Sequence, residues 1–142
     1  WSNSGSWYHG ERATDSDSRW TVLELGAGLG LCSCVAAKHG MNVVSTDNDP
    51  PVLSLLRENL QRNKFHDDDT LDSTQSISQQ SHVHSLDWLA IANDPNAESS
   101  HPVFLQLESL GGADLILLSD VIYGATQPAW DALLILLNKF CA

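Results

Sequence analysis

The sequence predicts an α/β domain in which a parallel β-sheet carries helices on both faces. Two observations support this prediction. Short apolar runs rich in β-branched residues alternate with longer amphipathic runs, and such alternation is typical of β-α-β units with right-handed crossovers. In addition, a glycine-rich segment at residues 26–30 separates the first apolar run from the first amphipathic one. Both features are typical of a doubly wound, Rossmann-like sheet, in which ligands bind at the carboxyl ends of the strands.

The first half of this pattern contains two strands and two helices. Residues 20–25 predict the first strand, and residues 29–39 predict the first helix, with Gly40 as the residue that ends it. A second strand is expected over residues 41–46. Asp49 precedes two prolines, which are tolerated in the first turn of a helix, and therefore marks the start of the second helix.

The second half contains two further strands and a final helix, separated by polar segments. Residues 62–81 and 94–101 are polar and are expected to be inserted loops. Residues 82–86 alternate as a short strand, whereas residues 113–119 form a nearly continuous apolar run, which favours a strand buried on both faces. The last helix opens at Gln127, and its apolar side is expected to consist of Leu133, Leu134, Leu136, Leu137 and Phe140.

Size and charge exclude several classes of protein. The 142 residues are 42% hydrophobic, which suits one domain with a real core, after a polar segment at residues 1–19. Seven Lys and Arg against eighteen Asp and Glu give a net charge of −11, which disfavours a nucleic-acid partner. No apolar run reaches the roughly 18 residues of a membrane span. Only three cysteines favour a reducing compartment, so a cytoplasmic or nuclear location is expected.

The glycine-rich segment predicts a nucleoside cofactor. Glycines allow a sharp turn and a close ligand approach, and Asp47 ends the second strand where such folds bind ribose hydroxyls. The dinucleotide fingerprint requires a small residue where this chain has Leu31, and Glu24 would repel a pyrophosphate. Glu24 instead suits a cofactor that carries positive charge and no phosphate, such as S-adenosylmethionine. In the alternative interpretation, the glycines form only a tight turn.

Four landmarks resemble one known family. Residues 24–30 (ELGAGLG) resemble motif I of the class I, seven-β-strand methyltransferases, and Asp47 follows in the expected place. Residues 85–88 (SLDW) and 120–123 (DVIY) resemble segments of the methyltransferase-like protein lysine methyltransferases, the second being their D-x-x-Y motif. The resemblance covers residues 22–140, apart from the two polar insertions.

The resemblance implies an S-adenosylmethionine-dependent protein-lysine N-methyltransferase with a protein substrate. It implies a catalytic pair, Asp120 and Tyr123. It also implies a set of cofactor-binding residues: Trp1, Glu24, Gly26, Ala27, Gly28, Gly30, Asp47, Asp87, Trp88 and Ser119. In this set Asp47 would bind the ribose, Asp87 would accept from the adenine amino group, and Trp88 would pack on the ring.

The catalytic pair also has a chemical rationale. A lysine ammonium must lose a proton before it can attack a methyl group, and Asp120 could hold and orient the incoming amine. An aromatic wall such as Tyr123 desolvates that amine, which lowers its pKa. The alternatives are that Asp120 only caps a turn, and that Tyr123 and Trp88 are plain core aromatics.

Several expectations concern what the chain lacks. The family norm is seven strands and only four are expected here, so the fold is predicted to be truncated after the fourth strand and its helix. The 142-residue chain alone is then expected to associate and to have little activity, whereas a full-length protein would be monomeric. Cys32 and Cys34 are expected to be small buried hydrophobes, and no metal site is expected. Rival functions are another methyl acceptor (arginine or a small molecule), a non-catalytic binding module, and an NAD-dependent oxidoreductase.

Overall fold

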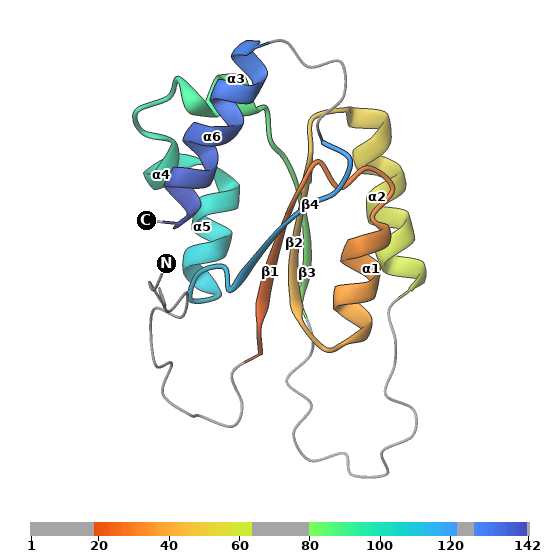
Figure 1. Ribbon diagram of the computed structural model, residues 1–142. Coiled ribbons are helices and arrows are strands. Elements are labelled where there is room, and N and C mark those ends of the chain that lie inside the picture. Colours follow the sequence, from red (N-terminus) through yellow and green to blue (C-terminus); the bar gives the residue numbers. More distant parts are fainter. Residues whose placement is uncertain (1–18, 64–79, 122–126, 142) are drawn as a thin grey trace, which may run out of the picture.

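The computed structural model describes residues 19–63, 80–121 and 127–141, which form a four-stranded parallel sheet between two layers of helices (Figure 1). The strand order is β3-β2-β1-β4, and each neighbouring pair is parallel. This arrangement confirms the predicted α/β, Rossmann-like fold. The strands are β1 (Thr21–Leu25), β2 (Asn42–Asp47), β3 (Ser81–Ser85) and β4 (Leu115–Leu118).

Helices cover both faces of this sheet, as predicted. Figure 1 shows the helices of residues 31–62 on one face and the helices of residues 88–141 on the opposite face. The first layer consists of α1 (Leu31–Lys38) and α2 (Pro50–Arg62). The second layer consists of α3 (Trp88–Ala92), α4 (Ala97–Ser100), α5 (Pro102–Ser109) and α6 (Gln127–Cys141). None of the helices in the described ranges has the length and apolar character needed to span a membrane.

β1 lies at the centre of the described sheet, and its residues alternate between the two helical layers. Val22 belongs to a core cluster with Val43 of β2 and the α1 alanines. Leu23 and Leu25 face the other layer, where they join the buried side chains of α5 and α6. All five β1 residues are buried, because β1 is paired on both sides and covered on both faces.

The region between β3 and β4 is more helical than predicted. Residues 94–101 were expected to form a polar loop, but α4 lies within them, and α3 and α5 flank it. Ala97 of α4 is completely buried, and the His101 side chain accepts a hydrogen bond from Val103 N at the start of α5. The loop prediction was wrong because most residues of this segment are polar. The single buried residue, Ala97, and the cap formed by His101 give no clear pattern in the sequence.

Two burial predictions also differ from the structure. β4 occurs where expected, but Leu115 and Leu118 are each 40% exposed, because β4 pairs only with β1 among the described strands. On α6, Leu133 and Leu136 are buried, whereas Leu134 is 64% exposed and lies outside the core. Most of the segment 1–19 and of the insertion 62–81 lies outside the described residues.

The exposed edge of β4 leads to a prediction about association. Among the described strands, its outer side has no partner, and exposed leucines lie beside it, a combination that favours pairing with another chain. We expect the 142-residue chain to show a mass that rises with concentration in light scattering, and Leu118→Lys to reduce this association. Leu55→Lys serves as the matched control, because Leu55 is similarly exposed but lies on α2. A monodisperse monomer at all concentrations would contradict the prediction.

Candidate functional site

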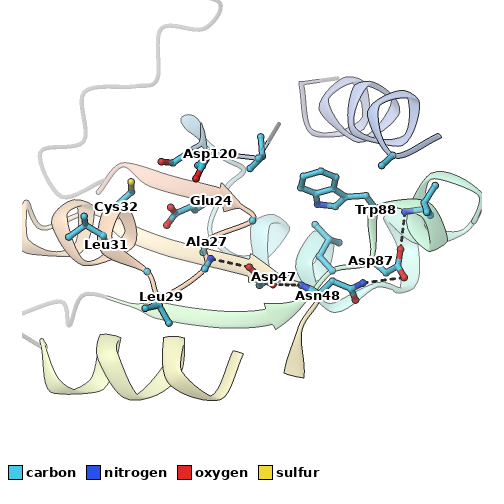
Figure 2. Close-up of a pocket in the computed structure, with 18 residues that line it drawn as sticks. Glu24, Ala27, Leu29, Leu31, Cys32, Asp47, Asn48, Asp87, Trp88 and Asp120 are labelled. Carbon is cyan, nitrogen blue, oxygen red and sulfur yellow. Dashed lines mark hydrogen bonds between the residues drawn. The ribbon is translucent and has the colours of Figure 1, made fainter. Parts of the chain in front are cut away.

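A cavity of about 670 Å³ lies at the carboxyl ends of the four strands (Figure 2). Each strand contributes the segment that follows it to the cavity wall. All ten predicted site residues within the described ranges line it: Glu24, Gly26, Ala27, Gly28, Gly30, Asp47, Asp87, Trp88, Ser119 and Asp120. The remaining two, Trp1 and Tyr123, lie outside the described residues. The structure therefore brings together residues that are almost 100 positions apart in the chain.

The glycine loop after β1 places the chain backbone at the cavity. Gly26 and Gly30 have φ values of 69° and 84°, in the left-handed region that favours glycine. A Cβ atom on Gly26 would lie only 2.9 Å from Val121 Cγ1, and one on Gly30 would collide with Leu56 of α2. In contrast, a Cβ on Gly28 would have no neighbour within 4 Å. Backbone conformation and packing thus both favour glycine at positions 26 and 30, whereas Gly28, with a φ of 54°, is favoured by conformation alone and borders open space.

The Asp47 carboxylate is held by backbone amides at the end of β2. Its Oδ2 accepts a hydrogen bond from Gly28 N at 3.0 Å, and its Oδ1 accepts from Asn48 N and Asp49 N at 2.8 and 3.1 Å. These bonds connect the β2 end to the glycine loop. They fix the carboxylate at the cavity wall, where its remaining lone pairs can accept from a ligand hydroxyl.

The segment after β3 supplies an acid and an aromatic ring. Asp87 is the N-cap of α3, since its Oδ1 accepts from Leu89 N and Ala90 N. Its Oδ2 lies 3.4 Å from Asn48 Nδ2. Trp88 is half-buried: it packs against the core of the second helical layer and also lines the cavity. Trp88 therefore belongs to the core and to the cavity wall at the same time, and its packing on an adenine ring stays a prediction.

Glu24 is a buried carboxylate behind the glycine loop. Its side chain is 1% exposed, and it accepts a hydrogen bond from the hydroxyl of Ser33 in α1. No Lys, Arg or His within the described ranges forms an ion pair with Glu24. An anion with little solvent and no cationic partner favours a positively charged ligand group in the adjoining cavity.

Asp120 follows β4 with an unusual backbone conformation. Its φ of 55° is the one positive value at a non-glycine residue in the described part of the chain. Aspartate tolerates this region better than most residues, and residues held there often occur at functional sites. Asp120 and the preceding Ser119 are exposed and line the cavity. In the view of Figure 2, Asp120 lies on the same side of the site as Glu24.

Sequence reasoning missed some cavity residues and misjudged others. Asn48 lines the cavity and bridges Asp47 and Asp87, and its place directly after the β2 acid was the available signal. Cys32 and Cys34 were expected to be buried, but both are only half-buried, and Cys32 lines the cavity from the first turn of α1. Burial and the nearby Glu24 charge raise the pKa of the Cys34 thiol.

The histidines in the described part of the chain do not line this cavity. His82 and His84 stack on β3 with ring centroids 6.3 Å apart, which confirms that they share one strand face. Burial lowers the pKa of both side chains, and for His84 the neighbouring positive groups lower it further. Within the described ranges, no three His, Cys, Asp or Glu side chains are grouped as metal ligands would be.

Comparisons with known proteins show the family of the chain. Residues 6–142 match the model of a family described as lysine methyltransferase. Over 120 residues, or 84% of the chain, the sequence is 33% identical to the protein-lysine methyltransferase METTL21E of Mus musculus and 32% identical to that of Bos taurus. It is 34% identical to a putative methyltransferase-like protein 21E pseudogene of Homo sapiens. The aligned part covers 34–40% of the length of these relatives. Because the family model matches nearly the whole chain, the chain belongs to the lysine methyltransferase family.

Proposed function

We propose that the protein is an S-adenosylmethionine-dependent protein-lysine N-methyltransferase whose cofactor site is the cavity at the strand ends. The charge of the cavity carries this proposal. Its lining contains four carboxylates, Glu24, Asp47, Asp87 and Asp120, and no Lys, Arg or His among the described residues. This lining suits a cofactor with a sulfonium and an ammonium group, and it is unfavourable for the pyrophosphate of a dinucleotide.

The size of the cavity also suits this cofactor. A volume of about 670 Å³ lies within the range of small-molecule sites. Asp47 would accept hydrogen bonds from the ribose hydroxyls, and Asp87 with Trp88 would hold the adenine. The methionine part would lie beside Gly28, where an added Cβ would meet no atom within 4 Å, and Glu24 lines the same cavity. When bound, S-adenosylmethionine supplies an electrophilic methyl group.

Asp120 and Ser119 would border the acceptor amine on the β4 side of the cavity. The amine must arrive unprotonated, with its lone pair aligned on the methyl carbon. A carboxylate fixed at the end of a strand can accept a hydrogen bond from the incoming nitrogen and orient it. Tyr123, as the fourth residue of the D-x-x-Y motif, is proposed as an aromatic wall beside the same amine.

A methyl-transfer assay tests the acceptor. The longest protein that the gene encodes is incubated with tritiated S-adenosylmethionine and a cytoplasmic or a nuclear extract, because these are the proposed locations. Labelled proteins are then hydrolysed and their amino acids separated. We expect the label in methylated lysine. Label in methylarginine or in small molecules would contradict the lysine assignment, and cofactor binding without transfer would indicate a non-catalytic module.

A further inference from the structure

Two buried serines lie behind Glu24 and connect it to neighbouring elements. Ser33 of α1 and Ser45 of β2 are both 0% exposed. The Ser33 hydroxyl bonds to the Glu24 carboxylate on β1, and the Ser33 and Ser45 hydroxyl oxygens lie 2.5 Å apart. The backbone of Glu24 is held as well, since Thr46 Oγ1 donates to its carbonyl oxygen at 2.8 Å.

The available protons fix the direction of these bonds. The Ser33 hydroxyl has a single proton, and it donates this proton to the Glu24 carboxylate. Ser33 then has only lone pairs to offer Ser45, and the Ser45 hydroxyl must donate to Ser33. Both hydroxyl dipoles therefore point toward the negative charge, and the Ser45 bond strengthens the Ser33 donor. Among the described side chains, Ser33 is the one that donates directly to Glu24.

We propose that Ser33, supported by Ser45, is a positioning residue that holds the Glu24 carboxylate toward the α-ammonium group at the amino-acid end of the cofactor. This inference rests on the proposed function, and it concerns only that end of the ligand. The ribose and adenine groups are assigned to Asp47 and Asp87. Among the described residues, neither aspartate forms a hydrogen bond with Ser33 or Ser45.

Two ligands separate a positioning role from a general structural role. S-adenosylhomocysteine carries the α-ammonium group, whereas 5′-methylthioadenosine has the same nucleoside without the amino-acid end. Calorimetric titration of Ser33→Ala should show roughly tenfold weaker binding of S-adenosylhomocysteine, as for loss of a hydrogen bond to a charged group. Binding of 5′-methylthioadenosine should stay within about twofold of the wild type.

Ser45→Ala tests the hydrogen bond between Ser45 and Ser33, and we expect it to have the smaller effect on binding. Because Ser45 acts through Ser33, its replacement should weaken S-adenosylhomocysteine binding by only about threefold. The double variant Ser33→Ala/Ser45→Ala should match Ser33→Ala alone, since the two effects are not additive in one network. Ser54→Ala, on the exposed side of α2, is the control and should bind both ligands as the wild type does.

Each outcome decides the inference. If Ser33→Ala loses affinity equally for the two ligands, or loses none, the inference is overturned. Circular dichroism verifies that the variant is folded. If Ser33→Ala does not fold, Ser45→Ala decides: a selective loss for S-adenosylhomocysteine supports the inference, and any other result overturns it. If the wild type binds neither ligand, the proposed function itself fails, and the inference fails with it.

Discussion

Replacement of Asp120 by alanine should abolish methyl transfer to protein while leaving the affinity for S-adenosylhomocysteine within a few-fold of the wild type. Asp120 lies on the wall of the cavity that would receive the acceptor, whereas the glycine loop and Asp47 are proposed to hold the cofactor. Loss of a positioned group that handles a proton or orients a nucleophile lowers rates by roughly 10²–10⁴-fold. The assay uses the longest protein that the gene encodes, with tritiated methyl donor and methyl-lysine as readout.

The backbone at Asp120 requires a matched second variant. Alanine at a φ of 55° is strained, so Asp120→Ala changes both charge and conformation. Asp120→Asn removes the charge but keeps a residue that tolerates this region, and it should lose activity almost as completely. Asp131→Asn, on the exposed surface of α6, is the charge control and should retain activity. Full turnover of Asp120→Asn would show that Asp120 is only a turn residue.

Replacement of Asp47 by alanine should weaken S-adenosylhomocysteine binding by roughly 1–3 kcal/mol, the range for leaving hydrogen-bonding groups unpaired. The variant loses a ribose acceptor and also frees the amides of Gly28, Asn48 and Asp49. Because 5′-methylthioadenosine contains the same ribose, its affinity should fall by a similar factor. This equal loss contrasts with the selective loss expected for Ser33→Ala.

Asp47→Asn separates the ribose contact from the loop contact. The asparagine oxygen can still accept from Asn48 N and Asp49 N, but its NH₂ group cannot accept from Gly28 N. We expect an affinity between those of the wild type and Asp47→Ala, measured by the same calorimetry. Unchanged affinity of Asp47→Ala for both ligands would eliminate the ribose assignment.

The sheet and the glycine loop were predictable because their signals are local. β1 and β2 are short apolar runs. β1 is followed by the glycine loop, and β2 ends at Asp47, so the candidate cofactor-binding residues lie at the carboxyl end of each strand. Because β1 and β2 are parallel, their carboxyl ends meet, and Asp47 therefore lies beside the glycine loop. For the same reason, the cavity includes every predicted site residue that the structure describes.

The remaining features depend on contacts between distant parts of the chain. Ser33 is nine residues from Glu24 and on another element, so no spacing rule connects its hydroxyl to that carboxylate. α4 was missed because a short helix held by one buried alanine has no apolar period of its own. The exposure of Leu134 on α6 depends on which elements lie opposite that helix, and an amphipathic pattern does not specify them.

The central claim is that the cavity binds S-adenosylmethionine, and a parallel calorimetric titration with S-adenosylhomocysteine and NAD tests it most directly. S-adenosylhomocysteine is the demethylated form of the cofactor and is chemically stable during the measurement. The four carboxylates of the cavity and its lack of a basic side chain among the described residues predict binding of S-adenosylhomocysteine at one site, and no binding of NAD. Binding of NAD, or failure to bind S-adenosylhomocysteine, would contradict the account.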